Sequence, residues 1–131
     1  MAKVVLGKRP ESFKRPVKFP MLDGTTGTIE VTYKYRTRKE FGAFVDSVAE
    51  AARAAGEVIV ADETKPFSLA EYFEKNSVAN ADYVLGIAQA WNLDVDFDKE
   101  AIEQLGDELP AALSAVMETY RLACVEGRLG N

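Results

Sequence analysis

The feature that most constrains the fold is an unbroken alternation of apolar and polar side chains over residues 28–36. Successive side chains of a β-strand point to opposite faces, so this alternation predicts a strand with one buried face, carrying Ile29, Val31, Tyr33 and Tyr35. Residues 13–19 alternate in the same way, with Phe13, Val17 and Phe19 on one face. Pro16 has no amide donor, which indicates an edge strand. We predict an antiparallel β-hairpin over about residues 13–36.

The turn of this hairpin decides its register. A two-residue turn at Asp23-Gly24 would place Val17 opposite Glu30, and apolar residues would then face polar ones across the pair. A loop with an odd number of residues instead pairs Val17 with Ile29 and gives Gly24 the left-handed position that such loops favour. We therefore expect a loop of three or five residues.

Apolar spacing becomes helical after Thr37, where Thr37 and Glu40 form a capping box. The first helix has the apolar stripe Phe41, Phe44, Val45, Val48 and Ala52 and is predicted to end at Gly56. Residues 57–65 are compatible with a short strand or a loop. A second capping box, Ser68 with Glu71, begins a helix that we expect to break around Asn76-Ser77. It then resumes with one stripe of Val84, Ile87, Ala88 and Trp91, and ends at Asn92.

Two further helices are predicted. Asp98 is a candidate N-cap for a short helix that ends near Asp107, and Pro110 fits the first turn of a last helix that ends at Gly127. The stripe of that helix is Leu113, Val116, Met117, Tyr120 and Cys124. We interpret each stripe as core, with Trp91 as a core anchor. The predicted fold is α+β: one domain over residues 1–131, with the N-terminal antiparallel hairpin packed on a bundle of about four to five helices from about residue 38 onward and flexible ends at 1–10 and 128–131.

Catalytic and metal-binding groups are few. The chain has no histidine and one cysteine, which removes the commonest general base, the commonest metal ligand and any internal disulfide. Cys124 is interpreted as an inert buried thiol. Asp94, Asp96 and Asp98 have the spacing of a calcium loop, but the glycine that should follow is missing, and an acidic helix start explains them more simply. We predict no enzyme activity, no catalytic residues, no metal and no cofactor.

Charge is divided along the chain. Residues 1–40 hold ten basic and four acidic side chains, and the remainder holds six basic and seventeen acidic ones. The basic hairpin raises the alternative of a nucleic-acid interface, although its aromatic side chains lie on the face opposite Lys34 and Arg36. The other reading is that the two parts attract each other or are simply solvated. The apolar runs are too short for a signal peptide or a membrane span, so we expect a cytoplasmic protein.

Taken along its whole length, the chain resembles the tail assembly chaperones of long-tailed bacteriophages and prophages. The resemblance rests on Val5-Leu6-Gly7-Lys8-Arg9-Pro10, Val17-Lys18-Phe19-Pro20 with Asp23-Gly24, Tyr33-Lys34-Tyr35-Arg36-Thr37-Arg38 with Glu40-Phe41, Trp91-Asn92-Leu93-Asp94, Glu108-Leu109-Pro110-Ala111-Ala112, Tyr120-Arg121, and Glu126-Gly127-Arg128-Leu129-Gly130-Asn131. No single one of these segments is a mechanistic signature, and the specificity comes from the set.

The resemblance implies a non-enzymatic protein of the host bacterial cytoplasm that is absent from the mature virion. It implies a chaperone that keeps the tape measure protein soluble and presents it to tail tube subunits. It further implies that the chaperone can form a homo-oligomer and has no membrane partner. The candidate partner-binding residues lie in one segment of the resemblance: Tyr35, Arg36, Arg38 and Phe41. The alternative function is a small nucleic-acid-binding regulator. A continuous exposed row of Lys14, Lys18, Lys34, Arg36 and Lys39 would favour the regulator, and an apolar groove would favour the chaperone.

Overall fold

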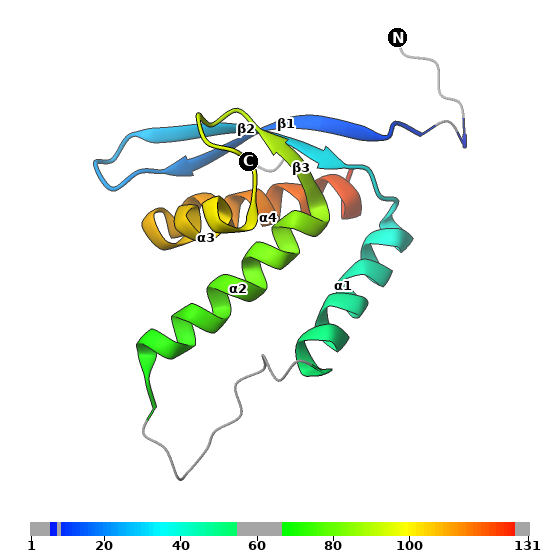
Figure 1. Ribbon diagram of the computed structural model, residues 1–131. Helices are drawn as coiled ribbons and strands as arrows, with labels where there is room; N and C mark the ends of the chain where they lie inside the picture. Colours follow the sequence, from blue (N-terminus) through cyan, green and yellow to red (C-terminus); the bar gives the residue numbers. More distant parts are fainter. Residues whose placement is uncertain (1–5, 8, 55–66, 128–131) are drawn as a thin grey trace.

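The computed structural model describes residues 6–7, 9–54 and 67–127 and has an α+β fold (Figure 1). Its elements, in chain order, are β1 (Ser12–Pro20), β2 (Thr26–Lys34), α1 (Arg38–Ala54), α2 (Leu69–Ile87), β3 (Ala88–Trp91), α3 (Lys99–Glu108) and α4 (Pro110–Val125). The helices lie on one face of the sheet, with α3 and α4 beneath it and α1 and α2 extending farther away from it on the same side. The predicted hairpin and the α+β class are confirmed. The predictions for residues 56–65 and 128–131 lie outside the described residues.

The hairpin has the register that its apolar pattern requires. Val17 pairs with Ile29 and Pro20 pairs with Thr26, which leaves a five-residue loop. Gly24 has a φ of +88°, a left-handed conformation that glycine adopts without strain. Asp23 Oδ1 accepts hydrogen bonds from the amide and the hydroxyl of Thr25, which lower the pKa of the Asp23 carboxyl and order the loop. Both the odd loop length and the position of Gly24 are confirmed.

Prolines lie along the open edge of β1. The sheet order is β1-β2-β3, so one side of β1 has no strand beside it. The Met21 amide donates to Thr25 O and the Tyr35 amide donates to Glu11 O, so the odd-numbered residues of β1 are those that hydrogen-bond to β2. Pro16 and Pro20 are therefore at positions where an amide would point outward. The sheet loses no ladder bond, and the edge has fewer donors for another strand.

The third strand corrects the predicted helix through Trp91. Helix α2 ends at Ile87, and the next four residues form β3, in which Trp91 pairs with Val31. Asn92 continues the pairing, because its amide donates to Glu30 O and its side-chain oxygen accepts from the Glu30 amide. These hydrogen bonds to β2 outweigh the helical spacing of Ala88 and Trp91, which is a weak local preference.

The predicted break at Asn76-Ser77 is also wrong, because α2 is continuous from Leu69 to Ile87. A polar residue costs a helix interior only a fraction of a kcal/mol, about 0.7 at most. The buried side chains of the following turns, Ala81, Val84 and Ile87, fix the C-terminal half of this helix against the core.

The predicted helix starts at Thr37, Ser68, Asp98 and Pro110 are confirmed, as is the end of the last helix at Gly127. The Thr37 hydroxyl accepts from the Glu40 amide at 3.2 Å, and Glu40 accepts from the Thr37 amide at 2.9 Å. At the next two starts, Ser68 accepts from the Glu71 amide and Asp98 accepts from the Ala101 amide. Pro110 is in the first turn of α4, and Gly127 after it has a φ of +67°.

The core lies where the sheet meets the helices. The sheet contributes Val17, Phe19, Ile29, Val31, Tyr33 and Ala88, and the helices contribute Phe41, Ala81, Val84, Ile87, Ile102, Ala112, Leu113, Val116 and Tyr120. Trp91 is half-buried against this core, with its indole N–H donating to Val95 O and its ring centroid 5.0 Å from that of Phe97 in a T-shaped arrangement.

Candidate partner-binding surface

Arg36, one of the candidate binding residues, is turned toward the carboxyl end of α2. Its guanidinium donates to Gly86 O at 2.8 Å and to the Tyr120 hydroxyl at 3.1 Å, and lies 4.1 Å from the centre of the Phe44 ring. Lys34 Nζ donates to Leu85 O at 3.2 Å. The last carbonyls of a helix carry partial negative charge, so these two cations stabilise the end of α2. Part of the positive charge of residues 1–40 thus stabilises the fold.

Phe41, a second candidate, is part of an aromatic cluster formed with Phe13, Tyr33 and Tyr120. It is only 8% exposed, and its ring meets Tyr120 edge-on at 5.7 Å. The Tyr120 hydroxyl donates to Lys34 O and the Tyr33 hydroxyl donates to Val116 O. Burial raises the pKa of both tyrosines well above the usual range. The aromatic cluster joins the end of β2 to α1 and α4.

The other two candidates lie nearer the surface. Tyr35 is half-buried, and the Arg9 guanidinium is 5.7 Å from its ring centre. Arg38 is exposed in the first turn of α1. The structure therefore separates the set into Arg36 and Phe41, which pack around Tyr120, and Tyr35 and Arg38, which reach solvent. Partner binding by these four residues stays a prediction.

The row of basic residues that would favour a nucleic-acid interface is interrupted. Lys14 and Lys18 are exposed on the outer face of the hairpin, together with the acidic Glu30, whereas the Lys34 ammonium donates to Leu85 O of α2. Arg36, in contrast, is half-buried against α2 and α4. A continuous cationic surface from the sheet to α1 would need this side chain at the surface, so the structure does not support the regulator reading.

The largest exposed aromatic side chains gather at the other end of α2. Phe67 is 72% exposed, Leu69 55%, Tyr72 39% and Phe73 57%. The rings of Phe67 and Tyr72 are 6.1 Å apart, and those of Tyr72 and Phe73 are 5.9 Å apart, so they form one contiguous surface. We call these four residues the apolar patch. Contiguous apolar surface of this kind marks places where proteins bind partners.

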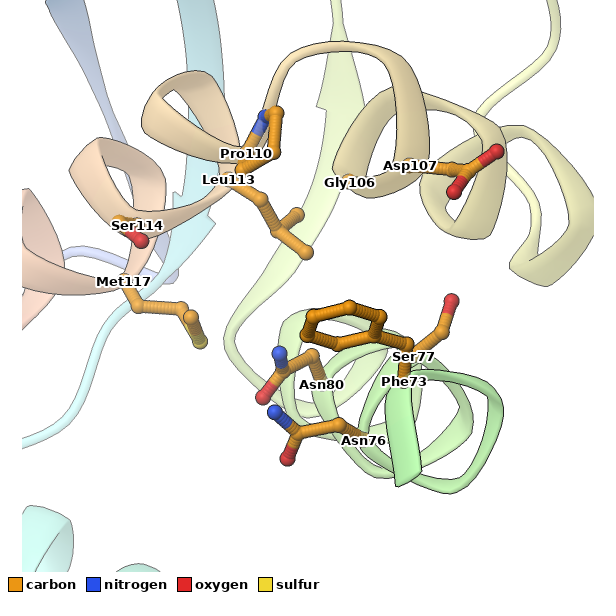
Figure 2. A pocket seen from close by; sticks show the side chains of 10 residues that line it. All are labelled: Phe73, Asn76, Ser77, Asn80, Gly106, Asp107, Pro110, Leu113, Ser114 and Met117. Atoms are coloured by element: carbon orange, nitrogen blue, oxygen red, sulfur yellow. The ribbon is translucent and has the colours of Figure 1, made fainter. Parts of the chain in front are cut away.

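A groove continues the apolar patch toward the corner between α3 and α4. It has a volume of about 370 Å³ and is lined by Phe73, Asn76, Ser77, Asn80, Gly106, Asp107, Pro110, Leu113, Ser114 and Met117. In Figure 2, Phe73 and Leu113 point toward each other across it, and Met117 lies farther along α4. A side chain at Gly106 would meet Leu113 Cδ2 at 2.6 Å, so the glycine lets Leu113 lie against α3. The groove thus has an apolar centre and short polar side chains at its margin.

Sequence reasoning did not find this site. The available signal is a group of four large apolar side chains within seven positions of a helix start. Of these four side chains, only Phe73 faces Leu113 and Met117, because of how three helices are placed relative to one another. Spacing along the chain does not encode that placement.

Few groups suited to acid–base or metal chemistry lie close together within the described residues. Within the described residues no three histidine, cysteine or carboxylate side chains are close enough to hold a metal ion. Asp98 is occupied as a helix cap. Burial raises the pKa of the half-buried Cys124 thiol, which favours its unreactive protonated form. No helix within residues 9–54 and 67–127 is long and apolar enough to cross a bilayer.

A comparison with protein families agrees with a binding role. The family model for the phage tail assembly chaperones matches residues 1–131, the whole chain. The chain belongs to this family. No curated protein and no solved structure shows a significant match. The resemblance found in the sequence is confirmed, and membership of this family implies binding to phage tail proteins.

Proposed function

We propose that this phage tail assembly chaperone is non-catalytic and binds the tape measure protein before the tail tube encloses it. It acts in the cytoplasm of the host bacterium, keeps the client soluble, presents it to tail tube subunits and leaves before the virion is complete. The client is long and partly apolar, and it cannot cover its own apolar side chains until the tube forms around it.

The observation that carries this proposal is the apolar patch beside the groove. Four large apolar side chains stay exposed at the start of α2, although the same fold buries twelve others in its core. Burying an exposed apolar side chain against a partner is worth about 1.5–3 kcal/mol when it becomes complete. A patch of this size would bind one client segment weakly. Many copies along a long client would bind it strongly through multivalency.

Charge supports the same function. The chain has a net charge of −5, which keeps a coated client dispersed. When no client is present, the uncovered apolar patch should give the protein a tendency to self-associate.

Co-expression tests the proposal. The tape measure protein is expressed alone and together with the chaperone, and the soluble client and the number of chaperone copies that co-purify with it are measured. We expect a marked increase in soluble client and several copies per client.

The control is Leu22→Ser, since Leu22 is 99% exposed at the tip of the hairpin, far from α2. This variant should solubilise the client as well as the wild type does. A client that stays equally insoluble, with a chain that instead shifts duplex DNA at physiological salt, would replace the chaperone reading with the regulator.

A further inference from the structure

We infer that the groove between α2 and the α3–α4 corner receives one face of a basic amphipathic helix, whose apolar stripe lies on Phe73 and Met117 above the buried Leu113. This inference rests on the proposed function, because it specifies the chemistry of the client segment that the chaperone binds. It follows from three features of the described residues: the apolar centre of the groove, the protection of the sheet edge and the sign of the charge on the groove walls.

The centre of the groove offers apolar contact and little else. Phe73 is more than half exposed, and Figure 2 shows it facing Leu113 across the cavity. Apart from Asp107, the polar lining consists of neutral amides and hydroxyls, Asn76, Ser77, Asn80 and Ser114. Such a surface suits alternate turns of a helix, whose apolar side chains enter the centre at spacings of three and four residues.

A helix fits this site better than an extended segment. An extended peptide needs backbone partners, which an exposed sheet edge provides. The groove is lined by helices, whose backbone groups already bond to one another. The open edge of β1 lies elsewhere in the molecule and has prolines at two of its outward positions, Pro16 and Pro20. A helical partner carries its own backbone hydrogen bonds and needs neither.

The walls of the groove determine the charge of the partner. Helices α2 and α3 together hold seven acidic and two basic side chains, a net charge of −5. Both lysines already pair with carboxylates, Lys75 with Glu71 at 3.4 Å and Lys99 with Asp82 at 3.0 Å. Asp107, in the groove lining, and Glu74, beside Phe73, form no ion pair within the described ranges. Lysine or arginine residues beside the apolar stripe of the partner would meet these carboxylates.

The same charge argues against a second copy of the chain as the occupant. Two copies facing each other through this surface would bring two negative helix pairs together, and like charges in contact across an interface oppose association. A basic client has no such penalty.

Two peptides test the inference with the full chaperone. Each has about 20 residues and the same leucine stripe at helical spacing, and the remaining positions carry lysine in one and glutamate in the other. Binding is followed by fluorescence anisotropy at physiological salt. We expect the lysine peptide to bind at least about tenfold more tightly than the glutamate peptide, since several rim charges change sign.

Matched variants locate the site. Phe73→Ser should weaken the lysine peptide by about tenfold, the loss expected for one large apolar contact, whereas Leu22→Ser should leave binding unchanged. Asp107→Lys should weaken binding several-fold more than Asp96→Lys, which makes the same charge change in the exposed loop before α3. Equal binding of the two peptides, or equal effects within either pair of variants, would overturn the inference.

Co-expression separates this inference from the proposed function. If the wild type and Phe73→Ser solubilise the tape measure protein equally, the chaperone function stands and the groove is not its binding site. If the wild type does not solubilise the client at all, the proposed function fails, and the peptide titrations alone decide the groove. Thermal melts of each variant show that it is folded, which is expected because Phe73, Leu22, Asp107 and Asp96 are all exposed.

Discussion

The two ends of α2 use apolar side chains in opposite ways. At its carboxyl end, Val84 and Ile87 are buried, and Arg36 and Lys34 bind the last carbonyls. At its amino end, Phe67, Leu69 and Phe73 are exposed, and a single serine hydroxyl caps the first turn. One helix therefore contributes to the core at one end and offers a binding surface at the other. Hydrophobic content alone therefore does not distinguish a structural residue from a functional one. Substitutions at the two ends of α2 test the distinction.

The largest expected difference in stability is between substitutions at Ile87 and at Phe73. Ile87→Ala should lower the free energy of unfolding by about 2–5 kcal/mol, because it leaves a cavity in the core. Phe73→Ala should change it by less than about 0.5 kcal/mol, since the ring is largely in solvent already. Urea unfolding followed by circular dichroism measures both values. A similar loss in both variants would show that the two ends of α2 are alike.

A second comparison places Arg36 against Arg38. Arg36→Ala removes two hydrogen bonds and the contact with Phe44, and should cost about 1–3 kcal/mol of stability. Arg38→Ala, at an exposed position two residues later, should cost less than about 0.5 kcal/mol. The same melts measure both. If Arg36→Ala instead keeps full stability and loses client binding, the residue belongs to the binding surface as the sequence suggested.

Alkaline pH should lower the stability of the folded chain through two buried tyrosines, Tyr33 and Tyr120. The pKa values of Tyr33 and Tyr120 are raised because burial disfavours the phenolate. Above about pH 10 the unfolded chain releases these protons and the folded chain keeps them, so the folded state binds more protons and stability falls as pH rises. The slope should reach up to about 1.4 kcal/mol per pH unit for each tyrosine.

Urea melts between pH 8 and 11 check this slope. Tyr120→Phe should reduce it, and the exposed Tyr72→Phe should not. A slope that is the same in all three proteins would mean that the buried hydroxyls do not control the alkaline limit.

The smallest expected effect is at the amino end of α2. Ser68→Ala removes the side-chain cap and should cost about 0.5–1 kcal/mol, confined to the first turns. Amide hydrogen exchange measures this directly. Exchange should accelerate at residues 69–73 and stay unchanged at residues 81–87. Equal acceleration at both ends would show that α2 opens as one unit and not from its exposed end.

Local chemistry made much of the fold predictable. Alternation over residues 28–36 gave the strand, and the need to keep Val17 and Ile29 on one face gave its register. Thr37 and Asp98 marked helix starts because their side chains satisfy amides only three residues away. Features set by neighbours in the chain were therefore within reach of sequence reasoning.

Long-range features were not predictable in the same way. Ala88–Trp91 pairs with a strand about 60 residues earlier, and nothing in these four residues signals that pairing. Arg36 bonds to groups 50 and 84 positions away, so it could not be distinguished from the exposed Arg38. The groove depends on how α2 meets α3 and α4. The sequence shows which of its residues are apolar, but it does not show which of them are exposed.

The direct passage from α2 into β3 has a mechanical consequence. No residue separates Ile87 from Ala88, so no linker lies between the helix and the strand. A helix of 19 residues is a stiff rod about 28 Å long. A sideways force on its amino end would therefore act as a torque on β3, the shortest strand of the sheet. The hydrogen bonds between β3 and β2 would resist this torque close to the point about which the helix turns.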